Sequence, residues 1–188
     1  MKVQIFKFFI YLFGSVFICN AQNLKKLKIN TELNNQYLES RKSYYGILTS
    51  EELIVIKNAF ENELHIKFTD DKAILINFFQ YGTNCIEYGF ESKFKEKAID
   101  KGVKLSNRIS KKYNALDFFI YTDDAINYEL LTKRRKFILD SGYFQKSIFT
   151  LQENCSAFFI LKPNGEFLKY YGEDYYSEVI NFLKDDED

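Results

Sequence analysis

The sequence predicts an α/β domain on one mixed β-sheet, in the order strand, helix, strand, helix, hairpin, helix. Two apolar runs, at 73–79 with one Asn and at 116–121 with one Asp, are typical of central strands covered on both faces. Between them, residues 86–113 repeat their apolar side chains at steps of about four and seven, which places them on one helical face. Later, two apolar segments flank the Pro-Asn-Gly turn at 163–165, a pattern typical of an antiparallel hairpin. A parallel βαβ unit followed by a ββα unit accounts for all of these features.

The composition indicates one globular domain and excludes several classes of function. The chain has 188 residues, is 46% hydrophobic and 18% aromatic, and balances 26 Lys and Arg against 26 Asp and Glu. It therefore has enough apolar residues to form a core. It has no net positive charge that would attract nucleic-acid phosphates. The single histidine, His65, excludes a zinc site built from two or three imidazoles. We therefore expect no metal, no cofactor and no nucleic-acid partner.

Residues 1–21 have the pattern of a cleaved secretory signal peptide. Lys2 and Lys7 form a basic start, and residues 8–19 are apolar. A cleavage junction that ends in a small residue, Ala21, follows them. The apolar run is shorter than the roughly 20 residues that a transmembrane helix needs. The sequence thus predicts export to the periplasm or the extracellular space, with no permanent membrane span after cleavage.

Two alternatives to simple cleavage stay open. The apolar run could remain as an anchor, or Cys19 could carry a lipid, although Ile18 stands where bacterial lipoprotein signals usually have a small residue. Cleavage after the junction removes Cys19 and leaves Cys85 and Cys155 in an oxidising compartment. Two thiols there tend to pair, and the alternative is two separate buried thiols that act as small hydrophobic residues.

Residues 22–71 are interpreted as an N-terminal extension with helical and strand elements. Its first part is polar and could hold a short helix at 31–40. A Thr-Ser-Glu-Glu start of the capping-box kind then predicts a helix at 49–62. Alternating apolar residues at 64–68 predict a half-buried strand with His65 on its polar side.

Residues 72–184 are predicted to form the main domain, followed by a solvated acidic tail at 185–188. The long helix at 86–113 could be continuous or broken at Gly102. The other expected elements are strands at 73–79, 116–121, 137–139, 157–161 and 166–171, helices at 122–131 and 174–184, and an amphipathic turn at 143–149.

Three segments of this domain resemble the thioredoxin-like superfamily, in particular its exported redoxin or TlpA type. Residues 74–79 (ILINFF) look like the family's first core strand, residues 159–166 (FILKPNGE) look like its late hairpin, and residues 137–140 (FILD) fit the redoxin connector. The resemblance covers about residues 72–184. It implies a three-layer sandwich around a central mixed sheet, with βαβ followed by ββα.

The departures from the family concern its active site. The family has a Cys-x-x-Cys pair at the start of the first long helix, where the helix dipole lowers a thiol pKa. Here only Cys85 lies in that region, with Gly82 three residues before it and Tyr88 three residues after it. Ser156 stands where the family has its cis-proline. A peroxiredoxin is also disfavoured, because Thr83 precedes the cysteine by two residues instead of three.

The resemblance further implies that Cys155 lies beside Cys85 and that the two form a disulfide, closing a loop of about 70 residues. We therefore expect an exported thioredoxin-like scaffold with a non-catalytic binding or structural role and an envelope or extracellular protein partner. The alternative is a thiol-disulfide oxidoreductase that uses Cys85, with Cys155 as the resolving thiol. In either case, the neighbourhood of the family's active site consists of Gly82, Thr83, Asn84 and Ser156.

Two further patterns have simple interpretations. Basic residues recur along 93–112 and at 133–136, and we interpret them as solvated flanks, with anion binding as the alternative. Four tyrosines could form an aromatic surface for a partner, although periodicity would bury about half of them. They are Tyr170, Tyr171, Tyr175 and Tyr176.

Overall fold

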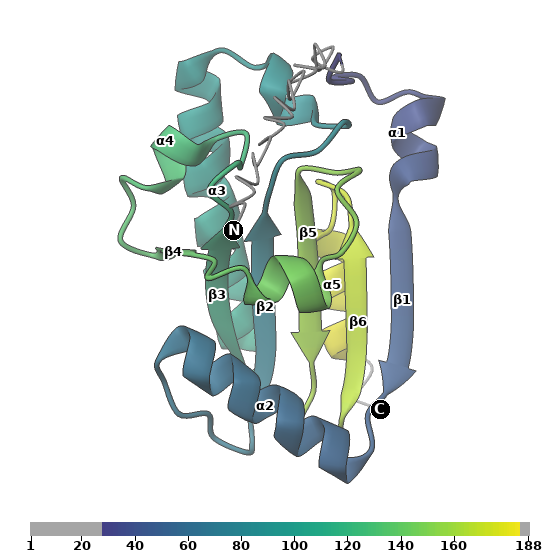
Figure 1. Ribbon diagram of the computed structural model, residues 1–188, viewed down its shortest axis with the longest axis vertical. Helices are drawn as coiled ribbons and strands as arrows, with labels where there is room; N and C mark the ends of the chain where they lie inside the picture. Colours follow the sequence, from purple (N-terminus) through teal and green to yellow (C-terminus); the bar gives the residue numbers. More distant parts are fainter. Residues whose placement is uncertain (1–27, 185–188) are drawn as a thin grey trace, which may run out of the picture.

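The computed structural model describes residues 28–184, which form one six-stranded sheet with helices on both faces (Figure 1). The predicted signal peptide and acidic tail lie outside the described residues. The strands are β1 (Lys42–Ile47), β2 (Ala73–Phe79), β3 (Ala115–Tyr121), β4 (Phe137–Leu139), β5 (Ser156–Leu161) and β6 (Glu166–Tyr171). The helices are α1 (Asn35–Ser40), α2 (Ser50–Leu64), α3 (Ser92–Lys112), α4 (Tyr128–Leu131) and α5 (Tyr176–Lys184), with a 3₁₀ turn η1 (Ile86–Gly89) and a π-helical turn η2 (Phe144–Ile148).

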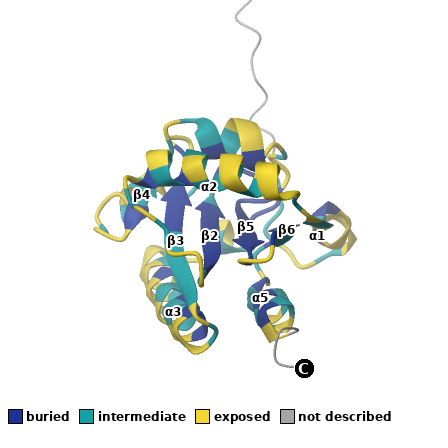
Figure 2. Cartoon of the chain, turned by 90° about the horizontal axis from the view of Figure 1, so that it is seen from below, coloured by how far each residue is buried: buried dark blue, intermediate teal, exposed yellow. Residues whose placement is uncertain are grey.

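The sheet has the mixed topology that the sequence predicts. Its strand order is β1-β6-β5-β2-β3-β4. β2, β3 and β4 run parallel to one another, whereas β5 is antiparallel to β2 and to β6. Helices α3 and α5 cover one face, and α2 covers the other (Figure 2). The predicted fold class, a thioredoxin-like three-layer sandwich, is confirmed by this arrangement.

The core lies on both faces of the sheet because side chains alternate along each central strand. In β2, Ile74, Ile76 and Phe78 pack on the α2 side, where Phe60 of that helix is fully buried among them. Leu75 of the same strand packs on the opposite side, against α3 and α5. The continuous apolar run at 73–79 is therefore a central strand covered on both faces, as predicted.

The predicted strand at 64–68 is wrong. Helix α2 continues to Leu64, and His65 ends it in the left-handed conformation with φ 54° and an exposed side chain. The carboxylate of Glu61 then accepts the backbone N–H of Phe68 at 2.8 Å. Ile66 and Phe68 still pack against the core. The alternation therefore reflects burial of two side chains in a loop and not pairing of a strand.

Strand β1 lies in the polar segment where only a short helix was expected. It pairs antiparallel with β6, from Lys42 opposite Tyr171 to Ile47 opposite Glu166, and forms one edge of the sheet. Its side chains are largely exposed, so the segment lacks the alternation that identifies a half-buried strand. The expected helix is present as α1, at the end of the predicted range 31–40.

The remaining elements refine the predictions. Helix α3 runs through Gly102 without a break, and η1 precedes it as a separate turn. The helix expected at 122–131 is a single turn, α4. None of the helices within residues 28–184 has the length and apolar character needed to cross a membrane.

The C-terminal tyrosines do not form the aromatic surface that was the alternative to their burial. Tyr170, Tyr171 and Tyr175 are buried, and Tyr176 is half-buried. Phe158 stacks on the ring of Tyr170, with centroids 5.5 Å apart. These rings therefore belong to the core and not to a docking surface. All basic side chains along α3 except that of Lys95 are exposed, as a solvated helix flank requires.

Candidate functional site

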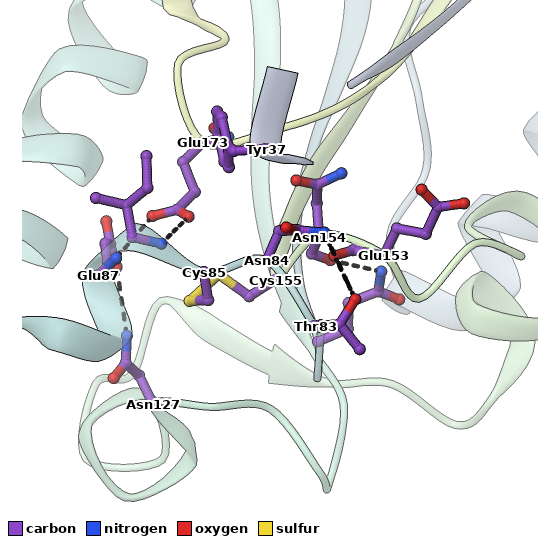
Figure 3. The surroundings of a disulfide bond; sticks show 12 residues. Tyr37, Thr83, Asn84, Cys85, Glu87, Asn127, Glu153, Asn154, Cys155 and Glu173 are labelled. Carbon is purple, nitrogen blue, oxygen red and sulfur yellow. Dashed lines mark hydrogen bonds between the residues drawn. A yellow bond between two sulfur atoms is a disulfide. The ribbon is translucent and has the colours of Figure 1, made fainter. Parts of the chain in front are cut away.

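The structure joins Cys85 and Cys155 in a disulfide at the carboxyl end of β2 (Figure 3). Cys85 follows β2 and precedes η1, and Cys155 lies immediately before β5. Their Cα atoms are 5.3 Å apart across a sequence separation of 70 residues. Cys85 is 0% exposed and Cys155 is 5% exposed. The pairing is the one that the family resemblance implied, and both half-cystines lie inside the protein.

Backbone contacts fix the two cysteine segments side by side. The N–H of Asn84 donates to the carbonyl of Glu153 at 2.8 Å, and the N–H of Cys155 donates to the carbonyl of Asn84 at 3.2 Å. Gly82 packs so closely on the Asn154–Cys155 backbone that a Cβ atom there would overlap it. Position 82 therefore requires glycine because of this close approach.

The other residues of the family's active-site neighbourhood have structural contacts. The carbonyl of Thr83 accepts the N–H of Asn30 at 2.8 Å, and the carbonyl of Asn30 accepts the N–H of Cys85 at 2.8 Å. Ser156 begins β5 opposite Phe79. The described residues contain no cis peptide bond. The N-terminal segment at Asn30 is thus hydrogen-bonded to both ends of the Thr83–Cys85 segment.

A residue that the sequence analysis missed, Glu173, lies against the disulfide. Its carboxylate oxygens accept the backbone N–H groups of Ile86 and Glu87 at 2.5 Å and 3.0 Å (Figure 3). A carboxylate oxygen of Glu173 and the sulfur atoms of Cys85 and Cys155 all lie within 4.8 Å of one another. Burial raises the pKa of Glu173 to about 7, against the lowering effect of the two backbone hydrogen bonds. No sequence motif signals this residue, because it lies 88 positions after Cys85.

The position of Glu173 determines the electrostatics of the cysteine pair. Backbone N–H groups at the start of a helix or turn stabilise a thiolate and lower the pKa of its thiol. Here the N–H groups of Ile86 and Glu87 already bind a carboxylate. A negative charge next to Cys85 also disfavours a second negative charge on its sulfur. The site therefore lacks the electropositive surroundings of a reactive cysteine.

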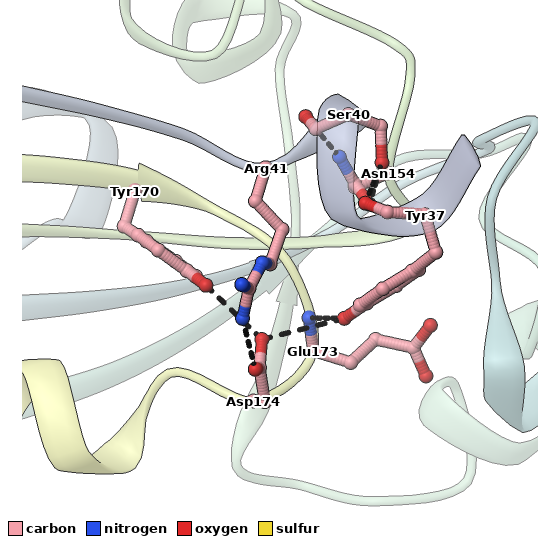
Figure 4. A network of polar contacts seen from close by, with 7 residues as sticks. All are labelled: Tyr37, Ser40, Arg41, Asn154, Tyr170, Glu173 and Asp174. Carbon is pink, nitrogen blue, oxygen red and sulfur yellow. Dashed lines mark hydrogen bonds and ion pairs between the residues drawn. The ribbon is translucent and has the colours of Figure 1, made fainter. Parts of the chain in front are cut away.

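A polar network holds the loop that carries Glu173 (Figure 4). The backbone N–H of Glu173 donates to the hydroxyl of Tyr37, at 2.8 Å, and Tyr37 is fully buried in α1. Asp174 pairs with Arg41 at 2.6 Å and accepts the hydroxyl of Tyr170 at 3.0 Å. Burial raises the pKa of Tyr37, so this hydroxyl stays protonated. The N-terminal segment thus positions the carboxylate beside the disulfide.

The same segment also fixes the residue before Cys155. Asn154 is fully buried, donates to the carbonyl of Ser40 at 2.8 Å and accepts the hydroxyl of Ser40 at 3.1 Å (Figure 4). Asn154 matches a glycosylation sequon, but a buried amide with these partners is not available to a glycosyl donor.

A metal could use these residues only after reduction of the disulfide. Cys85, Cys155 and Glu173 together offer two sulfur atoms and one carboxylate oxygen. A disulfide sulfur carries no thiolate charge, and the thiolate is the form that binds metals. In the oxidised protein these three residues therefore do not form a metal centre.

Comparison with protein-family models gave no match, and comparison with curated proteins gave none either. Among solved structures, the exposed lipoprotein thioredoxin Etrx1 of Streptococcus pneumoniae is 9% identical, with a TM-score of 0.40, over 62% of this chain and 86% of that chain. Copper-bound ScoI of Arabidopsis thaliana is 12% identical, with a TM-score of 0.33, over 61% of this chain and 83% of that chain. The fold assignment rests on the strand order and helix placement described above.

Proposed function

We propose that this chain is an exported thioredoxin-like scaffold with a non-catalytic binding or structural role. In this proposal, the Cys85–Cys155 disulfide is a permanent cross-link. The main support for this proposal is the burial of both cysteines. In addition, the carboxylate of Glu173 accepts hydrogen bonds from the two backbone amides that follow Cys85.

Poor access to the sulfur atoms and the charge beside them both limit thiol-disulfide exchange at this site. Thiol-disulfide exchange needs a thiolate to approach one sulfur of the disulfide. Cys85 has no exposed surface, and Cys155 has almost none. Above about pH 7, where Glu173 is mostly ionised, an approaching thiolate would also meet its negative charge close to both sulfur atoms. Both effects slow exchange and favour a structural disulfide.

Export and a partner protein complete the proposal. The signal-like residues 1–21 and a buried disulfide both fit an oxidising compartment, the periplasm or the extracellular space. Exposed aromatic side chains on η1 and at the start of α3 could contact an envelope or extracellular protein. They are Tyr88, Phe90 and Phe94.

One observation favours the alternative, a thiol-disulfide oxidoreductase. The carboxyl group of Glu173 has a pKa of about 7 and lies within 4.8 Å of both sulfur atoms, so it could accept a thiol proton. In the reduced protein, the thiolate of Cys85 would attack a substrate disulfide, form a mixed disulfide and release one substrate thiolate. Attack by the thiolate of Cys155 on the sulfur of Cys85 would then release the second substrate thiolate and form the Cys85–Cys155 bond, and an external dithiol would reduce the pair again.

Reduction of the native protein by dithiothreitol distinguishes the two functions. The protein is incubated with the reductant, alkylated at successive times and weighed by mass spectrometry, without and with a denaturing concentration of urea. For a structural disulfide, we expect reduction to be at least 100-fold faster in urea, because the sulfur atoms become accessible only on opening. Rapid reduction of the folded protein, with turnover of a disulfide substrate such as insulin, would instead establish the oxidoreductase.

A further inference from the structure

The charged side chains of the protein are unevenly distributed, and helix α3 carries a large excess of positive charge. Its 21 residues include eight Lys and Arg but only two acidic residues, Glu96 and Asp100. The whole chain has 26 charged residues of each sign, so the rest of it has 18 Lys and Arg and 24 Asp and Glu. A chain without net charge therefore has a positive field around one helix.

Most of this charge lies in a single row along the exposed side of α3. The buried residues of the helix are Ile99, Ser106, Ile109 and Ser110. With 3.6 residues per turn, the side opposite to them carries basic residues at successive steps of four, three, four and three positions. We call these exposed residues the basic stripe: Lys97, Lys101, Lys104, Arg108 and Lys111. At a rise of 1.5 Å per residue, the basic stripe is about 21 Å long.

Ion pairs within the protein do not neutralise the basic stripe. In the part of the chain that the structure describes, none of its side chains forms an ion pair. The carboxylate of Asp100, which lies on the same helix, is instead paired with Arg134 at 2.9 Å. Like charges that are three or four positions apart on a helix repel one another and destabilise it. The fold therefore does not account for the basic stripe, and a surface of opposite charge would relieve the repulsion.

A second basic segment, residues 133–136 between α4 and β4, lies beside the basic stripe. All four of its residues are Lys or Arg. The guanidinium of Arg134 donates to Asp100 at 2.9 Å, and the ammonium of Lys136 donates to a side-chain oxygen of the same helix at 2.6 Å. Lys104 of the stripe and residues 134–136 line a common groove. The fold thus joins two basic segments that are distant in the sequence into one basic face, which is wider than the helix alone.

An exposed aromatic ring lies at the N-terminal end of the basic stripe. Phe94 is 57% exposed, and the ammonium nitrogen of Lys97 lies 6.0 Å from the centre of its ring. At a membrane surface, an aromatic ring can enter the headgroup region while neighbouring cations meet the lipid phosphates. A soluble polyanion offers negative charge but no apolar region for the ring. The combination therefore favours a lipid surface.

We propose that the basic face binds the surface of a membrane that contains anionic phospholipids. The cations of the basic stripe and of residues 133–136 contact the lipid phosphates, so that α3 lies along the membrane surface. The attraction is electrostatic and acts within a Debye length of the surface. Phe94 enters the headgroup region and adds an apolar contribution. This role goes beyond the proposed scaffold function and does not depend on the redox state of the cysteines.

Co-sedimentation of the full, disulfide-bonded chain with sucrose-loaded vesicles tests the proposal. One preparation consists of phosphatidylcholine, and the other also contains about 30% phosphatidylglycerol, which is anionic. The measured quantity is the ratio of the two partition coefficients, because any contribution of the apolar residues 8–19 is common to both preparations. We expect the anionic vesicles to be favoured at least tenfold in about 0.1 M salt, and this preference to be lost in about 1 M salt. A ratio near 1 at the lower salt concentration would overturn the proposal.

Charge-removing variants locate the binding on α3. The double variant Lys101→Gln/Lys104→Gln should lower the ratio at least tenfold, because each basic residue near such a surface contributes about a factor of five. The control Lys42→Gln/Lys146→Gln removes the same charge at exposed positions outside the basic face and should leave the ratio unchanged. Circular dichroism verifies that each variant folds. An unchanged ratio in the folded stripe variant, or an equal fall in the control, would refute the assignment to α3.

A variant of the exposed ring separates a lipid surface from a soluble polyanion. Phe94→Ala should weaken binding to the anionic vesicles at least threefold and leave binding to dextran sulfate unchanged. Tyr45→Ala removes a similarly exposed ring outside the basic face and should change neither. Unchanged vesicle binding in folded Phe94→Ala, or binding of the wild type to dextran sulfate but not to vesicles, would overturn the assignment to lipid. The stripe variants retain Phe94, so they do not alter the aromatic side chains proposed to contact a partner protein.

Discussion

Removal of the disulfide should destabilise the protein by about 4 kcal/mol at 25 °C. The bond joins residues 70 positions apart, and the chain-entropy relation for a loop of this length gives a contribution on the order of 4 kcal/mol. For a chain of this size, that loss corresponds to a fall in Tm of roughly 8–16 °C. Urea denaturation of wild type and of the double variant Cys85→Ala/Cys155→Ala measures the difference in the free energy of unfolding.

The single variants make this prediction sharper. Cys85→Ala and Cys155→Ala each abolish the same cross-link, so each should lose about 4 kcal/mol and the double variant should lose little more. Reduced wild type, which also lacks the cross-link, should match the double variant within about 1 kcal/mol. A loss below about 1.5 kcal/mol in the double variant would refute the idea that the disulfide stabilises the fold by linking distant segments.

Three further predictions concern other parts of the fold. Because the pKa of Glu173 rises from 4.5 to about 7 on folding, the folded state holds a proton that the unfolded state has lost, so the free energy of unfolding should fall between pH 5 and pH 7. Urea melts should show a shallower fall in Glu173→Gln, and an unchanged slope would contradict this origin. Thr49→Ala removes the capping box of α2 and should lower stability by about 1 kcal/mol, whereas exposed Ser50→Ala should change it by less than about 0.5 kcal/mol; equal effects in urea denaturation would rule out the cap. Phe60→Ala deletes a fully buried ring of α2 and should lower stability by about 3–5 kcal/mol, and a loss under about 1 kcal/mol in the same assay would show that α2 is not part of the core.

The central strands could be predicted because their apolar composition directly indicates that they are buried. Residues 73–79 and 116–121 are apolar apart from Asn77 and Asp117, and strands covered on both faces have that pattern. The turn at 163–165 supplies the backbone conformation for the hairpin, and Gly165 adopts a positive φ of 88°. These local signals determine the order of the elements and therefore the topology.

Other elements depend on contacts that local patterns do not contain. β1 is a strand because its backbone pairs with the edge of β6. The side chains of β1 remain mostly exposed, including Tyr45 at 63% and Ile47 at 72%. Residues 64–68 alternate like a strand, but His65 in the left-handed conformation ends α2, and none of the strands within residues 28–184 pairs with this segment. Periodicity reports burial, whereas strand pairing depends on neighbours that are distant in the sequence.

The candidate site was predictable only in part for the same reason. The resemblance implied the proximity of Cys85 and Cys155, because a known topology brings their segments together. Glu173 could not be found in this way, since its position depends on the β6–α5 loop and on its contact with Tyr37. The carboxylate that determines the chemistry of the cysteine pair therefore emerged only from the three-dimensional structure.

The midpoint reduction potential of the Cys85–Cys155 pair is the most direct test of the claim that the disulfide is structural. Thiol trapping and mass spectrometry across a glutathione or dithiothreitol series measure it in the purified protein. The account predicts a potential below about −300 mV, which is typical of structural disulfides. A potential between about −120 and −270 mV, the range of thiol-disulfide oxidoreductases, would contradict it and favour the catalytic alternative.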